Sequence, residues 1–426
     1  MATFCVETLG CKANFAESAS IERELMSMGF SYNHENPDFV VINSCAVTRA
    51  AEFDSKKLIK RWRKKAPQAK IILTGCYAQY HPQEVKNEFK EIIIVGNNFK
   101  ETIPRLLNIH MPDKDLIISH YKEIKNNGLM WGTLSRTRYF IKIQDGCDYF
   151  CSYCIIPFLR GRSRSVPPDK ILDAVEEIIS KGGKEIVLTG INVGCYGLDM
   201  GTSLRDLLIL LSKTGIQRLR ISSIEPDLIT KELVKTIGEI RAVMPHFHIP
   251  IQSGSDRILK LMGRRYTVEQ VKRVVNMVVE LISDCSIGMD VITGFPGESD
   301  EDFENTYRLL EELPVAYLHV FTYSERMGTK AVRMAEPVPQ RIRKERTRLL
   351  RELSTMKRYS FYGKFTGRTF PVLFEEQNRY GEWEGWTPNY IKVAVPSNRA
   401  LRNEIAMVKL TNFNETKNSV EGIIVN

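Results

Sequence analysis

Three cysteines near the middle of the chain constrain its fold more than any other feature. Cys147, Cys151 and Cys154 form a C-x₃-C-x₂-C array directly after a strand-like run at 139–143. Three such thiolates can bind three irons of a 4Fe-4S cluster, and no fourth cysteine lies nearby in sequence, so one iron would stay open to an outside ligand. A structural zinc site is the alternative, but it requires four ligands, and the nearest histidine, His120, is 27 residues upstream.

The first part of the chain alternates β-rich runs with helical patterns. The alternation predicts βαβ units and a doubly wound parallel sheet, with strands at 4–9, 38–43, 70–74 and 91–95 and helices at 14–28 and 50–65. Cys11, Cys45 and Cys76 each follow one of the first three strands. Because the carboxyl ends of parallel strands meet at one edge of a sheet, we expect these thiols to converge there. The alternative is three unrelated buried thiols, which would not all be expected just past a strand end.

A second βα alternation runs from residue 139 to about residue 324. It predicts strands at 139–143, 185–188, 218–221, 247–251, 286–292 and 317–321, separated by helices such as 169–180 and 300–313. Six βα units are too few for a full eightfold barrel. Polar residues or glycine stand at or near the predicted strand ends, namely Gly190, Asn192, Ser223, Glu225, Gln252 and Asp290. Such positions carry reactive groups in a barrel, although Gly, Ser and Asn are also ordinary turn residues.

Two histidines and one further cysteine lie close to these strand ends. His246 and His248 flank one residue of a predicted strand, and we expect at most one of them to face the barrel interior. Packing is the simpler role for both. Cys195 has no cysteine partner in sequence and is expected to be a packing thiol in a loop near the site.

After Gly367 the pattern changes to short alternating strands, predicted at 369–374, 390–395, 405–410 and 420–425. This pattern predicts a small antiparallel β-barrel. Three aromatic residues, Trp383, Trp386 and Tyr390, lie among the basic residues Arg379, Lys392 and Arg399. That composition is typical of a surface that stacks RNA bases and binds phosphates. Burial in a small core is the alternative for some of these aromatic side chains.

Together these motifs resemble the radical S-adenosylmethionine methylthiotransferase family over the whole chain. The array at 147–154 is the signature of the radical superfamily, and the segment 385–390 (G-W-T-P-N-Y) resembles its TRAM domain. The sequences around the other three cysteines, T-L-G-C-K-A-N, N-S-C-A-V and T-G-C, resemble the family's N-terminal domain. The resemblance implies a partial (β/α)₆ barrel, with an N-terminal domain at 1–112, a radical domain at 133–362 and a TRAM domain at 363–426. A linker with the turn sequence Asn126-Asn127-Gly128 would join the first two domains.

The same resemblance implies two 4Fe-4S clusters and S-adenosylmethionine as cofactors. Cys147, Cys151 and Cys154 would bind the cluster that cleaves S-adenosylmethionine, and Cys11, Cys45 and Cys76 would bind an auxiliary cluster that handles sulfur. Tyr153 resembles the aromatic residue that packs near the adenine, and the polar strand ends, Gly190, Asn192, Ser223, Glu225, Gln252 and Asp290, match the cofactor pocket. The family's usual Gly-Gly-Glu after the second strand is absent, so contacts to the methionine amino group stay unassigned.

The segment around Cys11 also indicates a substrate. Its T-L-G-C-K-x-N form is similar to the branch that methylthiolates C2 of N6-threonylcarbamoyladenosine at position 37, beside the tRNA anticodon, using two S-adenosylmethionine molecules. Lys12 is then a hypothetical counter-ion for the threonyl carboxylate. Three alternatives are open: the isopentenyladenosine branch, the branch that modifies a ribosomal-protein aspartate, and a non-catalytic iron–sulfur protein that binds RNA.

The charge of the chain favours a polyanionic partner. Sixty Lys and Arg residues against 51 Asp and Glu residues give a net charge of +9. We expect the tRNA anticodon stem-loop to contact the TRAM domain and basic patches at 56–65, at 341–351 and at Arg160, Arg162 and Arg164. The start of the chain resembles no signal peptide, and no window approaches the about 18 apolar residues of a membrane span. A cytoplasmic location without membrane contact is expected, and the sequence does not identify the electron donor or the sulfur donor.

Overall fold

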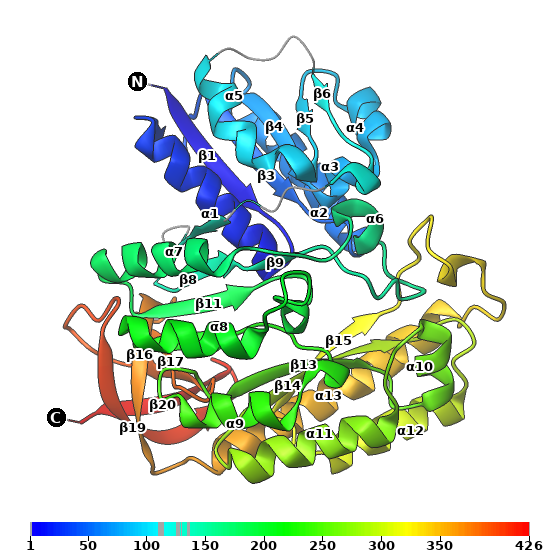
Figure 1. Cartoon of the computed structure of the whole chain (residues 1–426), viewed down its shortest axis with the longest axis vertical. Coiled ribbons are helices and arrows are strands. Elements are labelled where there is room, and N and C mark those ends of the chain that lie inside the picture. Colours follow the sequence, from blue (N-terminus) through cyan, green and yellow to red (C-terminus); the bar gives the residue numbers. More distant parts are fainter. Residues whose placement is uncertain (1, 110–114, 125–127, 129, 134–136, 426) are drawn as a thin grey trace.

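The computed structural model describes residues 2–109, 115–124, 128, 130–133 and 137–425, and the linker residues Asn126 and Asn127 lie outside these ranges. Three units follow one another along the chain, an N-terminal sheet, a central barrel and a small C-terminal barrel, and the first and the last each lie against the central barrel (Figure 1).

The N-terminal unit is a parallel sheet covered by helices on both faces. Its strands, in the order β2-β1-β3-β4-β5-β6, are β1 Thr3–Thr8, β2 Ser31–Tyr32, β3 Phe39–Ser44, β4 Lys70–Gly75, β5 Ile93–Val95 and β6 Leu116–Ile117. One face packs on α2 Arg49–Lys65, α3 Cys76–Tyr80 and α4 Pro82–Glu88, and the other on α1 Lys12–Ser27 and α5 Ile103–Ile109. The predicted doubly wound sheet is therefore confirmed. Only the edge strands β2 and β6 were not predicted, because two residues carry no periodic signal.

The central unit is a partial barrel of six parallel strands. They are β8 Tyr139–Lys142, β11 Glu185–Thr189, β12 Arg218–Ile221, β13 His246–Gln252, β14 Ser286–Thr293 and β15 Tyr317–Thr322, and β7 Met130–Gly132 adds an antiparallel edge beside β8. Isolated bridges join β12 to β13, which completes the order β8-β11-β12-β13-β14-β15. The short strands β9 Gln144–Asp145 and β10 Arg164–Ser165 pair at the rim. The (β/α)₆ prediction is confirmed.

The helices of the barrel follow the apolar periodicity of the sequence. They are α6 Ile156–Arg160, α7 Pro168–Ser180, α8 Leu204–Leu211, α9 Lys231–Glu239, α10 Asp256–Met262, α11 Val268–Leu281, α12 Asp300–Glu312 and α13 Gln340–Gly363. In α7, Ile171, Ala174, Val175 and Ile178 are buried, which is the i, i+3, i+4, i+7 face of an amphipathic helix. None of the helices within the described ranges is both long and apolar enough to cross a lipid bilayer.

The C-terminal unit is a closed five-stranded barrel, β16-β17-β18-β20-β19. Its strands are β16 Thr369–Gln377, β17 Trp383–Trp386, β18 Lys392–Val395, β19 Ile405–Asn414 and β20 Ser419–Ile424, and they pair antiparallel except for β18 with β20. The sequence did not predict β17, because Gly385 resembles a turn residue. In the structure a Cβ at Gly385 would lie 2.5 Å from the carbonyl oxygen of Leu373, so only glycine fits this strand.

Helix α1 joins the N-terminal sheet to the barrel. It packs on β7 and β8 as well as on its own sheet (Figure 1). The approach is close, because a Cβ at Gly132 of β7 would lie 2.6–2.7 Å from atoms of Ala19 in α1. Ala16, Phe140 and Val187 form a small apolar cluster across the same junction. The carboxyl edge of the N-terminal sheet is thereby held beside the barrel.

Two buried arginines of β12 attach the C-terminal barrel. Arg218 donates to the carbonyl oxygens of Trp386 and Pro371 at 2.9 and 2.6 Å. Arg220 donates to those of Pro388 and Thr387 at 2.9 and 2.7 Å. Glu185 of β11 is fully buried between them, with its Oε1 2.7 Å from the Arg220 Nε. The C-terminal barrel is thus firmly attached to the central barrel.

Replacing Arg220 should weaken this attachment. In Arg220→Ala the carboxylate of Glu185 loses its nearest buried partner, and the free energy of unfolding should fall by about 3–5 kcal/mol, as for other broken buried pairs. Urea unfolding followed by circular dichroism would measure the change. The exposed Arg273 of α11 is a control, because its replacement by alanine should change stability by less than about 0.5 kcal/mol. Equal effects of the two substitutions would contradict the assignment.

Candidate functional site

The three N-terminal cysteines converge at the carboxyl edge of the parallel sheet. Cys11 caps the amino end of α1 after β1, Cys45 follows β3, and Cys76 begins α3 directly after β4. A Cβ at Gly10, which has φ +95°, would lie 2.9 Å from the Sγ of Cys45. Burial, with smaller contributions from Cys76 and Cys11, raises the pKa of the Cys45 thiol to about 12. The three thiols therefore lie near one another, as strand topology predicted.

The C-x₃-C-x₂-C array forms the second group of thiols. Cys147, Cys151 and Cys154 pack into one cluster, and the predicted packing thiol Cys195 lies against it. Burial raises the pKa of Cys147 to about 11 and that of Cys154 well above its usual value, and in both cases Cys151 raises it further. Such thiols stay protonated at neutral pH unless a metal binds the thiolate form. Three clustered thiols of this kind fit an iron–sulfur cluster.

Arg160, which follows the array on α6, links the two groups of thiols. Its side chain is 1% exposed and donates to Glu17 Oε1 at 2.7 Å, to Asp145 Oδ1 at 2.9 Å and to Asn14 Oδ1 at 2.6 Å. The Nδ2 of Asn14 donates in turn to the carbonyl oxygens of Leu9 and Ser44, beside Cys11 and Cys45. A continuous set of buried hydrogen bonds therefore connects the array to the N-terminal thiols.

The expectation that Arg160, Arg162 and Arg164 contact phosphate is wrong for Arg160, because its charge is buried and paired. Arg164 donates to the carbonyl oxygens of Arg160 and Arg162 at 2.8 and 2.6 Å and has a side chain only 13% exposed. Arg162 is exposed and pairs with Asp148 at 2.9 Å. The sequence could not separate these roles, since alternation along a loop does not reveal which side chain turns inward.

A cavity opens directly beside the array. Tyr153, Cys154, Gln252 and Asp290 line it. The N-terminal unit closes one side with Val47 and Thr48, two and three residues after Cys45, and Arg326 also lines it. The nitrogen Nη1 of Arg326 donates to the carbonyl oxygen of Ala46 at 3.2 Å, which ties the barrel to that loop. The cavity thus lies between Cys154 of the array and the loop that follows Cys45.

The other predicted pocket residues lie around this cavity and not in its lining. Gly190 and Asn192 lie beside Gln144, whose Oε1 accepts the backbone N–H of Asn192 at 2.9 Å. Asn192 is buried, and its side-chain amide has no hydrogen-bond partner among the described residues. Ser223 bonds to His248 through its hydroxyl at 2.8 Å. Buried polar groups without a partner are uncommon, so Asn192 suits a bound ligand.

Glu225 pairs with an arginine that the sequence did not single out. Arg264 forms an ion pair with Glu225, and its Nη1 lies 3.1 Å from the Sγ of Cys151 and 3.4 Å from the hydroxyl of Tyr153. Burial acts to lower the pKa of Arg264, but the surrounding tyrosines and Cys151 outweigh it and raise that pKa. The residue follows helix α10 in an irregular segment, where no periodicity or motif marks it. A carboxylate and a guanidinium beside the array form a pair of opposite charges suited to an amino acid.

His246 and His248 both face the interior, contrary to expectation. Residues two apart in a strand share a face, so the two side chains point the same way. The Nε2 of His246 bonds to the hydroxyl of Tyr317 at 2.8 Å. The Nε2 of His248 lies 3.1 Å from Asp290 Oδ1 and 3.2 Å from the Nδ1 of His319. The interior of the barrel is therefore polar next to the cavity.

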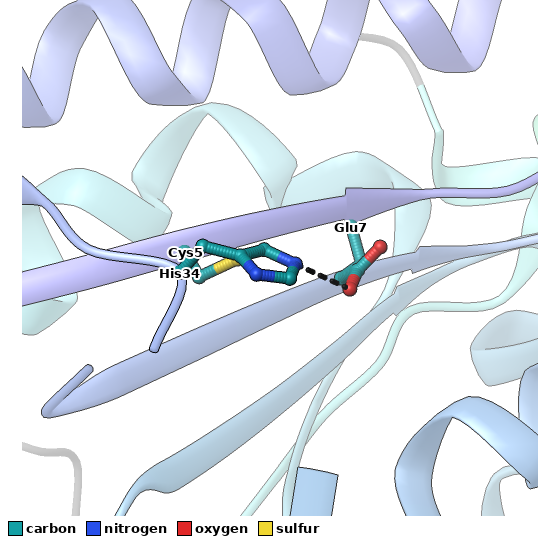
Figure 2. A group of neighbouring side chains, drawn as sticks. All are labelled: Cys5, Glu7 and His34. Atoms are coloured by element: carbon teal, nitrogen blue, oxygen red, sulfur yellow. Dashed lines mark ion pairs between the residues drawn. The ribbon is translucent and has the colours of Figure 1, made fainter. Parts of the chain in front are cut away.

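A second group of potential metal ligands consists of Cys5 and Glu7 of β1 and the neighbouring His34 (Figure 2). Its ligand atoms already have partners. Glu7 pairs with Arg61 and accepts from the indole N–H of Trp62 at 2.9 Å, and the Nδ1 of His34 lies 3.2 Å from Lys65 Nζ. Burial also raises the pKa of Cys5 to about 11. Two cations beside the group make it an ion-pair network and not a metal centre.

Two family models match this chain. One, described as the Radical SAM superfamily, matches residues 141–310, and the other, Uncharacterized protein family UPF0004, matches residues 3–96. Among solved structures, the chain resembles TsrM of Kitasatospora setae, a radical S-adenosylmethionine methyltransferase, with a TM-score of 0.55 and 13% identity over 78% of this chain and 77% of that one. The fold and the cysteine array thus define a radical S-adenosylmethionine enzyme, whose cofactors are S-adenosylmethionine and 4Fe-4S clusters.

Similar proteins with assigned names show which kind of radical S-adenosylmethionine enzyme this is. The chain is 40% identical to the threonylcarbamoyladenosine tRNA methylthiotransferase of Aquifex aeolicus over 91% of this chain and 95% of the relative. The protein of the same name from Bacillus subtilis is 35% identical over 96% and 94%. A tRNA-2-methylthio-N6-dimethylallyladenosine synthase of Protochlamydia amoebophila is 32% identical over 88% and 86%. The chain belongs to the radical S-adenosylmethionine tRNA methylthiotransferase family.

The buried network around Arg160 predicts how the site responds to acid. Burial acts to raise the pKa of Glu17, but Arg160, Lys100 and Lys142 outweigh it and hold that pKa well below its usual range. A carboxylate with a lowered pKa stabilises the fold above its unfolded pKa of about 4.3, and this stabilisation is lost as the pH falls. Glu17→Gln should therefore lower the free energy of unfolding at pH 7 by about 3–5 kcal/mol and flatten its decline below about pH 5.

Denaturant unfolding at several pH values would measure both effects. The exposed Glu280 of α11 is the matched control, and Glu280→Gln should leave the profile unchanged. A Glu17→Gln protein that is as stable as the parent at pH 7 would contradict the role of the network.

Proposed function

We propose that this enzyme replaces the hydrogen at C2 of N6-threonylcarbamoyladenosine, at position 37 beside the tRNA anticodon, with a methylthio group, and consumes two S-adenosylmethionine molecules. One observation carries the proposal. A single cavity is lined by Cys154 of the array and by Val47 and Thr48, which closely follow Cys45 of the N-terminal unit. Radical formation and sulfur delivery can then act on one substrate atom.

Each group of thiols is assigned one 4Fe-4S cluster. The ligands of the radical cluster are Cys147, Cys151 and Cys154, and those of the auxiliary cluster are Cys11, Cys45 and Cys76. When bound, the first supplies the electron that cleaves S-adenosylmethionine and the second supplies sulfur. The protein encloses both groups of thiols, and the hydrogen bonds of Arg160 fix the position of one group relative to the other.

S-adenosylmethionine is assigned to the cavity beside the array. Tyr153, Gln252 and Asp290 line its walls. Arg264 and Glu225, next to Cys151, are suited to the carboxylate and amino group of the methionine part. Asn192, with an amide that lacks a partner in the described part of the chain, and the nearby Gly190 and Ser223 remain candidates for polar contacts.

The threonylcarbamoyl substrate is supported by the names of the more similar relatives and by Lys12. Among the described residues no carboxylate lies within 4 Å of the Lys12 ammonium. Such a cation suits a charged nucleoside substituent, whereas an isopentenyl group is neutral. The ribosomal-protein branch is disfavoured by the sequence around Lys12 and by the basic surface, since its target is a protein aspartate. The isopentenyl branch is the second candidate, since relatives with that specificity in their names are also similar over most of the chain.

A basic groove leads to the cavity and is suited to the tRNA backbone. Arg49, Lys344 and Arg351 line it, and it shares the wall 321–324 with the cavity. Lys344 and Arg351 are exposed on α13 without ion pairs in the described structure. In contrast, the basic run at 56–65 is largely neutralised, for example by pairs of Lys56 with Glu84 and Glu88. The groove is therefore the better phosphate site.

Removing each group of thiols should have a different effect. Replacing Cys147, Cys151 and Cys154 together by alanine should remove about four of about eight irons and abolish both 5′-deoxyadenosine and methylthio product. Replacing Cys11, Cys45 and Cys76 should remove the other four irons and abolish only the product. Iron analysis and nucleoside mass spectrometry after anaerobic reconstitution measure these outcomes.

Cys285→Ala is the control for this experiment, because that buried thiol lies away from both groups and should leave the iron content unchanged. A wild-type protein that binds both clusters and tRNA but forms no 5′-deoxyadenosine under reduction would instead favour a non-catalytic RNA-binding role.

The groove predicts salt-dependent binding. Lys344→Ala and Arg351→Ala should each weaken tRNA binding regardless of sequence and reduce the slope of log K against log salt by about one. Lys213→Ala, an exposed residue near the amino end of β12, should leave the slope unchanged. Fluorescence anisotropy with a labelled stem-loop over a range of salt concentrations measures the slopes, and unchanged slopes in both groove variants would rule out the groove.

A further inference from the structure

A group of polar side chains beside the cavity comes from all three units of the chain. Lys12 lies at the start of α1, His319 and Asp290 lie on barrel strands, and Tyr390 lies in the turn between β17 and β18. The ring centroid of Tyr317 lies 5.1 Å from that of His319 and 6.2 Å from that of Tyr390. Burial lowers the pKa of Lys12, whereas Tyr390 and Asp290 act to raise it, so both lie near the lysine. Asp290 also lines the cavity that contains Cys154, and Lys12 directly follows Cys11.

One cation of this group, Lys12, has no direct ion pair within the described residues. Arg138 donates to both carboxylate oxygens of Glu375, at 2.7 and 3.2 Å. Arg220 donates to Glu185 and to two backbone carbonyl oxygens. The hydrogen-bonding capacity of these guanidinium groups is thus largely used within the protein. Lys12 has no carboxylate within ion-pair distance in the described structure, so a ligand with a single negative charge would match it better than a phosphate dianion.

His319 is oriented by its neighbours and keeps one ring nitrogen available. Its Nδ1 lies 3.2 Å from both Asp290 Oδ1 and His248 Nε2. His248 is held on its other side by the hydroxyl of Ser223 at 2.8 Å. The Nε2 of His319 has no hydrogen-bond partner within the ranges that the structure describes, and the side chain is 51% exposed. A fixed imidazole with an available nitrogen can bind a polar ligand without further ordering.

Tyr390 is held in place by stacking and by an unusual backbone conformation. Its ring lies 4.2 Å from that of His246 and 4.4 Å from that of Trp386, at interplanar angles of 27° and 21°. Its φ is +63°, a left-handed conformation that costs free energy in a residue other than glycine. The C-terminal barrel thus brings a rigid hydroxyl-bearing ring against the barrel interior. Strain of this kind is a recurrent feature of binding sites.

We propose that Lys12, His319 and Tyr390 form a pocket for a carboxylate carried by the substrate nucleoside, which makes this pocket the determinant of substrate class. The proposal rests on the function proposed above and names the part of the enzyme that selects a charged N6-substituent. Lys12 pairs with the carboxylate, and His319 and Tyr390 provide neutral hydrogen-bonding partners and the wall. The C-terminal barrel then contributes to substrate selection as well as to RNA binding.

The test compares two substrates with two proteins. Anticodon stem-loops carry either N6-threonylcarbamoyladenosine or its methyl ester, which removes the negative charge and little else. The cluster-loaded wild-type enzyme should lose about 10- to 100-fold in kcat/KM on the ester, the range expected for one charged hydrogen bond. Lys12→Gln should lose a similar factor on the acid and should no longer distinguish acid from ester.

Because Lys12 neighbours a cluster cysteine, a second variant is needed. His319→Gln keeps a polar side chain, is remote from both groups of cysteines in sequence, and should also lose activity preferentially on the acid while its iron content stays unchanged. Lys70→Gln, at the opposite end of β4, is the control and should behave as wild type. Equal use of acid and ester by the wild type, or equal losses on both substrates in the two variants, would overturn the pocket.

Stem-loop binding to the cluster-loaded enzyme, measured by anisotropy, separates this proposal from the proposed function. A wild-type preference for the acid that disappears in Lys12→Gln supports the pocket even where no methylthio product forms. That combination of results would contradict the proposed reaction and support the proposed pocket. Product formation from acid and ester alike, with equal binding of both stem-loops, would support the proposed reaction and contradict the proposed pocket.

Discussion

The buried side chain of Arg160 is the interaction on which the site depends. It binds Glu17 and Asn14 of the N-terminal unit and Asp145 of the barrel, so it joins two units that meet through helix α1. Buried charges are costly unless they are paired, and this network pairs three cations with two carboxylates. The network matters for the geometry of the site, because it fixes the relative position of two groups of thiols that lie on different units.

The C-terminal barrel has a similar relation to the site. Arg218 and Arg220 hold its backbone, and the turn they hold carries Trp386 and Tyr390 toward the barrel interior. A barrel that is attached in this way keeps one position relative to the cavity. Under the proposed function, binding of the stem-loop and placement of the target base would therefore be one event, with the groove at Lys344 and Arg351 beside the cavity.

Much of the fold was predictable because its signals are local. Strand and helix periodicity predicted the doubly wound sheet and the six barrel strands. It missed β2, β6, β7, β9, β10 and β17, where strands of two or three residues or a required glycine leave no pattern. The convergence of Cys11, Cys45 and Cys76 followed from strand topology alone. Arg264 was missed, since an arginine in an irregular segment gives no sign that it turns toward Cys151. The expectation for His246 and His248 was wrong, because residues two apart in a strand share a face.

By itself, the sequence identified the six candidate cluster cysteines, the order of the three units and the family, because these depend on short motifs and on spacing. Only the tertiary structure decided which charged side chains form ion pairs inside the protein. Arg160 resembled a phosphate ligand in sequence, yet it is buried with Glu17. In the part of the chain that the structure describes, Lys12 has no ion pair and lies near Tyr390, more than 370 residues away in the chain. Charge pairing depends on neighbours in space, and the sequence does not contain that information in any local form.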